Sequence, residues 1–180
     1  MNFDENLEIE RKYIIELPTA KDIEEIRSAD GVSGYSVSKI EQIYLAAVGK
    51  THRIRRRESD GRVKYYETVK IRVDKMSAIE NEREITESEY LELSKKIRQG
   101  SRPINKVRHL FYFNGQPYEI DVYPFWKRTA VLELELADRG TRVAFLPQIR
   151  VIREVTGDKR YSNSALADSP VPESENIMKV

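Results

Sequence analysis

The 180-residue sequence predicts an α+β domain, an eight-stranded antiparallel closed or nearly closed β-barrel with a charged interior and helices packed outside. Three observations lead to this fold. Seven segments alternate apolar and charged residues with a period of two, which is typical of strands with two different faces. Turn sequences separate these segments, as in antiparallel sheets. The charged positions recur in same-sign pairs from strand to strand, and such pairs favour a shared interior over a solvated face.

The alternating segments set the positions of the predicted strands. They cover residues 7–16, 51–58, 63–73, 79–85, 104–113, 117–123 and 130–137, and an eighth strand is expected around 41–46. Turn signals lie between several of them. Asn114-Gly115 is a two-residue hairpin sequence between two aromatic strands.

Two of the predicted helices begin with capping sequences. Thr19 with Asp22 begins the first helix, and Thr86 with Glu89 begins the second, which ends at Gly100. In each pair, the threonine side chain and the acidic side chain three residues later satisfy backbone donors of the first turn. The sequence therefore predicts helices after the first and fourth strand segments.

The C-terminal part of the chain has weaker signals. A third helix is expected near 141–146 and a last turn at 163–167. Residues 168–180 contain two prolines, few aliphatic side chains and no periodicity. We therefore expect one domain over residues 1–167 and a disordered tail over 168–180.

The composition excludes several classes of function. Lys and Arg number 31 against 30 Asp and Glu, and this balance argues against a general nucleic-acid binder. The absence of cysteine excludes a disulfide framework, a thiolate nucleophile and a cysteine-rich zinc site. No stretch has the apolar length of a signal peptide or a membrane span, so a cytoplasmic protein without a membrane partner is expected.

The strands place their charges on one face, because residues two apart in a strand point the same way. Glu8, Glu10 and Lys12 share a face, and Ile9 lies on the other. The same division recurs at Arg53, Arg55, Thr68, Lys70, Glu82, Glu84, Lys106, Arg108, Glu119, Asp121, Glu133 and Glu135. For a single strand, a solvated face is the more common explanation. Repetition over seven strands favours a closed barrel, and eight strands leave room inside for a small ligand.

The charged residues predict the chemistry of that ligand. Six basic side chains could hold several phosphate or carboxylate groups, namely Lys12, Arg53, Arg55, Lys70, Lys106 and Arg108. Five carboxylates would repel the same anion, namely Glu8, Glu10, Asp121, Glu133 and Glu135. They fit the site if they hold Mg²⁺ or Mn²⁺, since these cations prefer carboxylate oxygen and bridge to phosphate.

The order of these motifs resembles a known family. Glu8-Ile-Glu10-Arg-Lys12 matches the Glu-x-Glu-x-Lys signature of the CYTH, or triphosphate tunnel metalloenzyme, superfamily, which includes class IV adenylyl cyclase and thiamine triphosphatase. The later blocks follow in order over residues 7–167, including Arg53-Ile-Arg55, Thr68-Val-Lys70, Lys106-Val-Arg108, Tyr118-Glu-Ile-Asp121, Glu133-Leu-Glu135 and Glu154 to Asn163. The sequence is most similar to the compact bacterial inorganic triphosphatases. It departs from the pattern at Glu80, where many relatives have arginine, and this leaves the role of position 80 open.

The resemblance implies a role for each charged group. The six basic residues would bind the triphosphate, and Glu8, Glu10, Asp121, Glu133 and Glu135 would hold two Mg²⁺ or Mn²⁺ ions directly or through water. Glu8, Glu10 and Lys106 are the expected catalytic residues, with Glu8 or Glu10 accepting a proton from water. Candidates for the tunnel wall or a lid are Glu82, Glu84, Lys159, Arg160 and Tyr161.

The resemblance also implies a triphosphatase, a metal-dependent phosphoanhydride hydrolase acting on a small-molecule triphosphate. Inorganic tripolyphosphate is the first expectation, with nucleoside triphosphates as less selective substrates. The alternatives are a class IV adenylyl cyclase that makes cyclic AMP from ATP, a thiamine triphosphatase, and a non-catalytic polyphosphate or nucleotide sensor. The acidic residues argue against the sensor, because an anion binder has little use for them. Both a monomer and a homodimer are compatible with the sequence.

Overall fold

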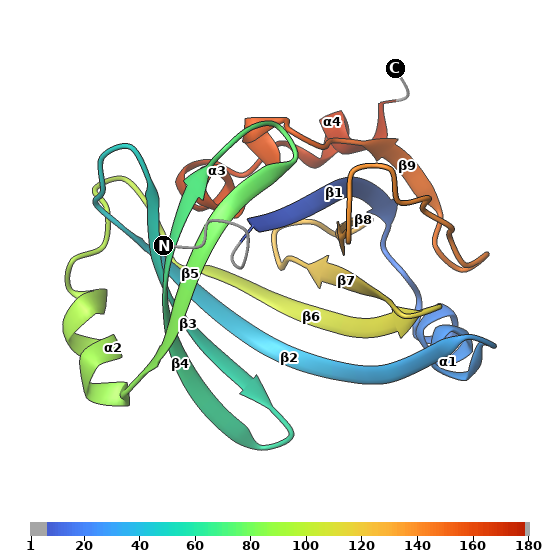
Figure 1. Ribbon diagram of the computed structural model, residues 1–180, viewed down its shortest axis with the longest axis horizontal. Helices are drawn as coiled ribbons and strands as arrows, with labels where there is room; N and C mark the ends of the chain where they lie inside the picture. The colour runs from blue at the N-terminus through green and yellow to red at the C-terminus, as the bar shows by residue number, and fades with distance from the viewer. Residues whose placement is uncertain (1–6, 179–180) are drawn as a thin grey trace.

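The computed structural model describes residues 7–178 as nine strands and several short helices around a barrel (Figure 1). The strands are β1 (Leu7–Glu16), β2 (Val32–Leu45), β3 (Thr51–Ser59), β4 (Arg62–Arg72), β5 (Ser77–Ile85), β6 (Ile104–Phe113), β7 (Gln116–Val122), β8 (Thr129–Glu135) and β9 (Val151–Glu154). The helices are α1 (Ala20–Ser28), α2 (Glu87–Ser94), the 3₁₀ helix η1 (Lys159–Tyr161), α3 (Asn163–Asp168) and α4 (Glu173–Ile177). None of the helices in residues 7–178 is long and apolar enough to cross a membrane.

Eight antiparallel strands close the barrel, as the sequence predicts. Their order is β5-β4-β3-β2-β6-β7-β8-β1, and β1 pairs back onto β5. One edge of β1 runs beside β8, from Glu10 opposite Glu135 to Glu16 opposite Thr129. The other edge meets β5 through residues 7–9 and the short strand β9 through residues 13–15. The first strand therefore joins the two ends of the sheet.

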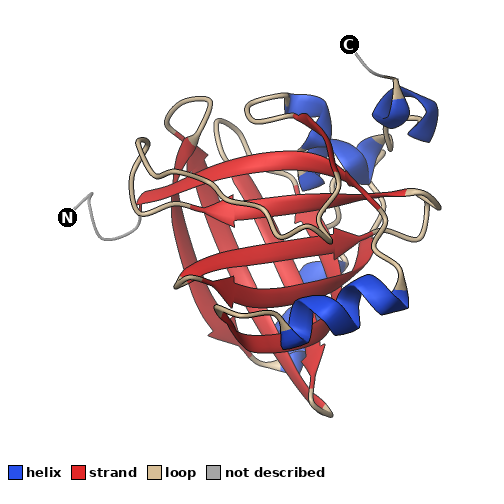
Figure 2. Cartoon of the chain, turned by 90° about the vertical axis from the view of Figure 1, so that its right-hand side faces the viewer, coloured by secondary structure: helices blue, strands red, loops and turns tan. Residues whose placement is uncertain are grey.

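The outward faces of the strands are apolar and are covered in two places. Phe111, Ile120 and Leu132 pack with Ile26 of α1 and with Leu146 from the segment before β9. A second cluster forms where Tyr90 of α2 packs on Ile43 and other outward residues of β2, β3 and β5. In Figure 1, α1 and α2 lie near opposite ends of β2, and Figure 2 shows helices outside the strand wall. Both helices begin with the predicted capping boxes at Thr19 and Thr86.

One end of the barrel interior is filled by apolar side chains. Ile14, Ile104 and Val131 each lie two residues from a charged inward position, and they pack against Tyr161 of η1 and Leu166 of α3. The β9-to-α3 segment is fastened to β1, because Val155 N donates to Lys12 O over 2.8 Å. This apolar cluster therefore borders one side of the charged interior.

Two strands differ from the sequence expectation. The predicted strand at 41–46 is the end of the 14-residue strand β2, whose first half is rich in serine and contains Gly34. A register shift between Ser33 and Ser36 interrupts its pairing with β6. Gly34 has φ +62°, and a Cβ there would lie 2.9 Å from the Tyr112 ring. Small polar residues at a bulge carry no strand periodicity, and β9 is too short, at four residues, to show one.

The helix predicted near 141–146 is wrong. These residues form a loop, in which Leu146 and Val143 pack on the outer apolar cluster and Phe145 meets the Tyr13 ring edge-on at 5.2 Å. The apolar side chains of this segment cover the barrel wall from a loop instead. The turn predicted at 163–167 is helix α3.

The tail expected to be disordered from residue 168 is ordered over its described part. Val171 and Asn176 are buried, and the Trp126 indole donates to Val171 O over 2.9 Å. The Glu173 carboxylate accepts hydrogen bonds from the backbone N–H groups of residues 127, 128 and 129 over 2.6–3.0 Å. These polar and indole contacts replace the aliphatic packing whose absence suggested disorder. Residues 179–180 lie outside the described residues.

The Glu173 contact predicts a pH-dependent contribution to stability. Burial would raise the pKa of Glu173, but the backbone donors outweigh burial and lower the pKa. A lowered folded-state pKa stabilises the protein above the unfolded-state value and ceases to do so as the pH falls. Glu173→Gln should lower the melting temperature at pH 7 by about 3 to 6 °C. The difference should begin to shrink as the pH falls below about 4.3 and should disappear only below the lowered folded-state pKa.

Differential scanning calorimetry from pH 3 to 8 measures this effect. Glu175→Gln is the matched control, because the Glu175 carboxylate lies on the same helix and pairs with exposed Arg160. An exposed ion pair contributes little, so the control should change the melting temperature by less than about 2 °C. Equal changes in melting temperature for the two variants would show that the Glu173 contact with the backbone stabilises the protein no more than an exposed ion pair does.

Candidate active site

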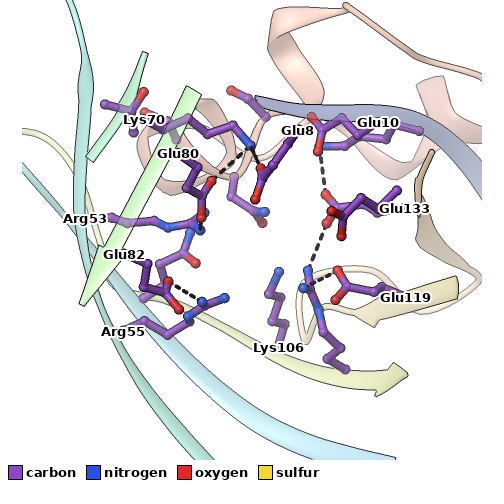
Figure 3. A pocket seen from close by; sticks show the side chains of 18 of the residues that line it. Glu8, Glu10, Arg53, Arg55, Lys70, Glu80, Glu82, Lys106, Glu119 and Glu133 are labelled. Carbon is purple, nitrogen blue, oxygen red and sulfur yellow. Dashed lines mark hydrogen bonds and ion pairs between the residues drawn. The ribbon is translucent and has the colours of Figure 1, made fainter. Parts of the chain in front are cut away.

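The barrel encloses a cavity of about 320 Å³ whose lining is mostly charged. Seven basic side chains line it, namely Lys12, Arg53, Arg55, Lys70, Arg72, Lys106 and Arg108. Seven carboxylates line it as well, namely Glu8, Glu10, Glu80, Glu82, Glu119, Glu133 and Glu135. The neutral lining includes Gln42, Tyr44, Thr51 and residues 162–164. Figure 3 shows these side chains converging from strands on all sides. The strand alternation therefore places both signs of charge around one space.

The β3–β5 side of the cavity is a chain of ion pairs. Arg53 contacts Glu80 at 2.6 Å, and Arg55 contacts Glu82 at 2.5 Å. Lys70 contacts Glu80 at 3.1 Å and reaches across the β1–β5 seam to Glu8 at 2.9 Å. The ion pairs thus fasten the seam where the barrel closes.

A second network covers the β6–β8 side and centres on Arg108. Its guanidinium donates two hydrogen bonds of 2.7 Å to Asp121 and one of 2.9 Å to Glu133, and it also contacts Glu119. Lys106 contacts Asp121 at 2.5 Å, and Lys12 contacts Glu133 at 2.8 Å. Asp121 is fully buried behind Lys106 and Arg108 and does not reach the cavity surface.

Burial and neighbouring charges shift the pKa values of these groups in different directions. Burial would raise the pKa of Glu133, but Lys12 and Arg108 hold it well below its ordinary value. Burial, reinforced by the Arg108 charge, lowers the pKa of Lys106 to about 8, although the Asp121 ion pair opposes the shift. Burial raises the pKa of Glu8, and Lys70 opposes this. Lys106 is therefore the cavity cation whose charge changes closest to neutral pH.

Two carboxylates of the cavity have no direct ion pair. Glu10 and Glu135 lie directly opposite each other across β1 and β8, and no direct ion pair joins either of them to a cation within residues 7–178, although the Glu10 charge contributes to the raised pKa values of Lys12 and Lys70. The next inward pair along the same strands is Lys12 opposite Glu133, which has opposite signs. Like charges opposite each other in a sheet repel. A divalent cation between Glu10 and Glu135 would relieve this repulsion, and oxygen ligands of this kind suit Mg²⁺ and Mn²⁺.

Comparisons with known proteins agree with this geometry. A protein named inorganic triphosphatase, from Acetivibrio thermocellus, is 36% identical over 109 residues, which are 59% of this chain and 67% of that protein. This chain belongs to the CYTH, or triphosphate tunnel metalloenzyme, superfamily. No protein-family model matches the sequence.

Solved structures share the CYTH barrel. The crystal structure of the inorganic triphosphatase NE1496 is similar with a TM-score of 0.55 and 25% sequence identity, over 90% of this chain and 95% of that one. The PH1819 protein of Pyrococcus horikoshii has a TM-score of 0.55 and 20% identity, over 73% of this chain and 80% of that one. The second likeness shows the fold alone.

The cavity of this CYTH protein contains most of the predicted site. All six basic residues predicted to bind the triphosphate line it, as do Glu8, Glu10, Glu133 and Glu135 of the predicted metal ligands. Asp121 instead lies behind the wall, where it holds Lys106 and Arg108 in place. Among residues 7–178, no three acidic or histidine side chains converge tightly enough to form a metal-binding group without rearrangement. The basic side chains hold several carboxylates apart.

The predicted tunnel and lid residues divide into two groups. Glu82 lines the cavity of the CYTH barrel, whereas Glu84 is exposed and pairs with Lys64 at 2.9 Å. Lys159 and Arg160 do not line the cavity, and Arg160 pairs with Asp158 and Glu175 on the surface. Tyr161 is buried, and its hydroxyl donates to Asn176 over 3.0 Å. Tyr161 therefore packs the closed end of the barrel.

Several residues of the CYTH cavity were not predicted as site residues. Glu80 holds both Arg53 and Lys70, and Glu119 contacts Arg108. The alternation placed Glu119 on the same strand face as Asp121, but the sequence analysis gave Glu119 no role in the site. Gln42 and Tyr44 gave no charge signal, although they lie two residues apart on one face of β2.

The facing pair of carboxylates predicts a metal-linked change in stability. Glu135→Gln removes one charge from the pair while keeping the shape of the side chain. Without added metal, the melting temperature should stay the same or rise, because the repulsion is relieved. The apparent affinity for Mn²⁺, measured by the metal-dependent rise in melting temperature, should fall by about tenfold or more. Glu84→Gln, outside the cavity, is the control and should respond to Mn²⁺ as the wild type does. An unchanged Mn²⁺ response in Glu135→Gln would rule out this position for the cation.

Proposed function

We propose that this protein hydrolyses inorganic tripolyphosphate to pyrophosphate and orthophosphate with the help of a divalent cation. The observation that carries the proposal is the state of two buried guanidinium groups. Arg53 and Arg55 line the cavity, yet their Nε–H donors have no acceptor within residues 7–178 although carboxylates surround them. Guanidinium groups that line a cavity and keep unpartnered donors suit a multivalent oxyanion.

The size and lining of the cavity favour a compact triphosphate. The six predicted basic residues surround about 320 Å³, which suits a chain of phosphates held from several sides. Tyr44 is the aromatic residue of the described lining, and its hydroxyl accepts a hydrogen bond from Gln42. No further ring in the described lining offers a stacking surface for adenine or thiazole. The named activities of the inorganic triphosphatase relatives support the same substrate.

The carboxylates of the cavity fit the cation that such a substrate requires. Glu10 and Glu135 would hold a divalent ion, with Glu8 beside them, since Glu8 and Glu135 already repel each other electrostatically. Mg²⁺ or Mn²⁺ would neutralise phosphate charge and polarise the terminal phosphoryl group. A second divalent ion would need a further carboxylate that has left its ion pairs. Glu133 would take this role only after its contacts with Lys12 and Arg108 are broken.

The protein residues would divide the remaining work between binding and proton transfer. Lys12, Arg53, Arg55, Lys70 and Arg108 would hold the phosphate oxygens and align the chain. In its neutral form, Lys106 would accept a proton from water as the water oxygen forms a bond to the terminal phosphorus. The bridging P–O bond then breaks, and its electron pair leaves with pyrophosphate. A base with a pKa of about 8 suits this step at neutral or slightly alkaline pH.

The activity itself is the first test. Purified protein should release orthophosphate from tripolyphosphate with Mg²⁺ or Mn²⁺, and turnover should stop when EDTA is added and return when the metal is restored. The value of kcat/KM should be at least about tenfold higher for tripolyphosphate than for ATP or thiamine triphosphate, because the cavity offers no nucleoside site. Turnover that survives chelation, or cyclic AMP as the main product from ATP, would contradict the proposal.

The pH dependence tests the role of Lys106. Because the folded-state pKa lies near 8, the neutral amine is scarce below that pH and abundant above it. We expect kcat/KM, which reports the pKa of the free enzyme, to rise with pH and level off above about pH 8. Lys106→Arg keeps the positive charge but cannot accept the proton, so kcat should fall by about 100-fold and the rise of kcat/KM with pH should be lost. The stabilisation of the protein by metal tripolyphosphate should survive in Lys106→Arg. A variant that keeps the wild-type pH profile would exclude Lys106 as the base.

A further inference from the structure

Arg72 differs from the other cations that line the cavity in its hydrogen-bond partners. Each of the six others contacts a carboxylate at 2.5–2.9 Å. Arg72 Nη1 donates instead to the backbone carbonyls of Asp74 and Lys75 over 3.4 and 3.2 Å, and no ion pair joins Arg72 to a carboxylate of residues 7–178. A guanidinium carries five N–H donors, so these two bonds leave donors for a ligand.

The carboxylates nearest to Arg72 in the sheet are held by another cation. Glu80 lies diagonal to Arg72 across β4 and β5. Glu8 lies on β1, and Ala78 of β5 is opposite both Glu8 and Arg72. Lys70 contacts Glu8 and Glu80, as the dashed lines of Figure 3 show. Arg72 therefore remains a positive charge that the free protein does not neutralise by direct contact with these neighbours.

The turn after β4 holds the Arg72 guanidinium in place. The Asp74 carboxylate accepts hydrogen bonds of 2.8 and 3.0 Å from the backbone N–H groups of residues 76 and 77, and it also pairs with Arg139. Asp74 thus orders the turn, while the turn carbonyls orient Arg72 without neutralising it. A donor that is already ordered loses less conformational freedom when it binds an anion.

Arg72 also marks an opening of the cavity. It lines the cavity but is exposed to solvent, whereas Lys106 of the same lining is only 4% exposed. A small space beside Arg72 lies between the turn after β4 and residues 155–158, and Glu10 and Lys12 border it as well. The cations of the cavity therefore extend from a buried end to an open one. A linear chain of phosphates that contacts the buried cations would leave its other end beside Arg72.

The phosphate at that open end differs between the candidate substrates. In inorganic tripolyphosphate it is a second terminal phosphoryl group with three non-bridging oxygens. In a nucleoside triphosphate it is an ester with two non-bridging oxygens and one negative charge fewer. A guanidinium fork binds the terminal group more strongly, because it meets more charge and more acceptor oxygens. Binding at Arg72 also requires no carboxylate to be displaced from it.

We propose that Arg72 is a specificity-determining residue that binds the second terminal phosphoryl group of inorganic tripolyphosphate and so favours it over esterified triphosphates. This inference rests on the proposed triphosphate hydrolysis and adds the group that recognises the substrate end distant from the attacked phosphorus. Loss of such a group weakens one substrate and spares the others. A purely structural residue would affect all substrates alike.

Three substrates test this role in the wild type and in Arg72→Gln, namely tripolyphosphate, ATP and methyl triphosphate. Methyl triphosphate has an esterified end with little added bulk, so it separates recognition of terminal charge from exclusion of a nucleoside. In Arg72→Gln, kcat/KM for tripolyphosphate should fall by about 10- to 100-fold, as expected for lost hydrogen bonds to a charged group. For ATP and methyl triphosphate, kcat/KM should stay within about threefold of the wild-type value. The preference for tripolyphosphate should therefore largely disappear.

Arg62→Gln is the matched control. Arg62 is an exposed arginine at the other end of β4 and on the same strand face, but it is not part of the described cavity lining. Its replacement removes the same charge and should leave kcat/KM at the wild-type level for all three substrates. Arg72→Lys keeps the charge without the bidentate fork, so its preference for tripolyphosphate should lie between those of the wild type and Arg72→Gln.

The other outcomes would overturn the inference. An equal loss of kcat/KM for all three substrates would mean that Arg72 supports the turn or contacts a phosphate that they share. An unchanged preference in Arg72→Gln, or a wild type that does not distinguish tripolyphosphate from methyl triphosphate, would remove Arg72 from substrate selection. The ratio between substrates does not depend on the amount of folded enzyme, so it stays decisive if a variant is less stable. A wild-type protein that does not hydrolyse tripolyphosphate would overturn the proposed function itself.

Discussion

The barrel depends on the mutual neutralisation of the charges that its strands turn inward. Moving an ion out of water costs several kcal/mol even after relaxation, and removing one partner of a buried pair costs about 3 to 5 kcal/mol. Seven cations and seven carboxylates line the same small cavity, so most of that cost is offset locally. Arg108 alone meets three carboxylates. The apolar outer faces then pack under α1, α2 and the loop before β9 in the ordinary way.

The same neutralisation links the two ligands of the proposed function. Two ion pairs in the cavity, Lys70 with Glu8 and Lys12 with Glu133, each occupy a cation that a phosphate would use and a carboxylate that a metal would use under the proposed function. Lys70 illustrates this, because it holds Glu8 and Glu80 together. A metal that takes the carboxylates frees the cations, and a triphosphate that takes the cations frees the carboxylates. By thermodynamic linkage, each ligand strengthens the binding of the other by the same factor.

The sequence predicted the parts of the molecule in which periodicity and charge act together. The inward charges of β1, β3, β4, β6 and β8 were identified, because a period of two assigns every residue to a face. The first half of β2 was missed, since serines and Gly34 at a bulge carry no such signal. The 141–146 segment packs apolar side chains on the barrel from a loop. The sequence alone does not distinguish such a loop from a short helix.

The prediction of the site was incomplete for residues whose role depends on their contacts in the folded barrel. Asp121 has the right residue type and face, but its depth behind Lys106 and Arg108 is a property of the closed barrel. Arg72 became notable only once its place in the cavity and its hydrogen bonds to backbone carbonyls were known. The C-terminal segment is held by Glu173 at three backbone donors and by the Trp126 indole. Such contacts leave no periodic trace in the sequence.

The placement of β1 has a consequence for how the chain folds. This strand precedes the other strands of the barrel in the chain, yet its partners are β5, β8 and β9, and the last two follow every other strand of the sheet. Closure must therefore wait for contacts between residues more than 100 positions apart, such as Lys12 with Glu133, and topologies of this kind fold slowly. During that interval the edge of β1 that later pairs with β8 is unpaired. Alternating Glu8, Glu10 and Lys12 keep that edge charged, which protects a nascent strand from pairing with other chains.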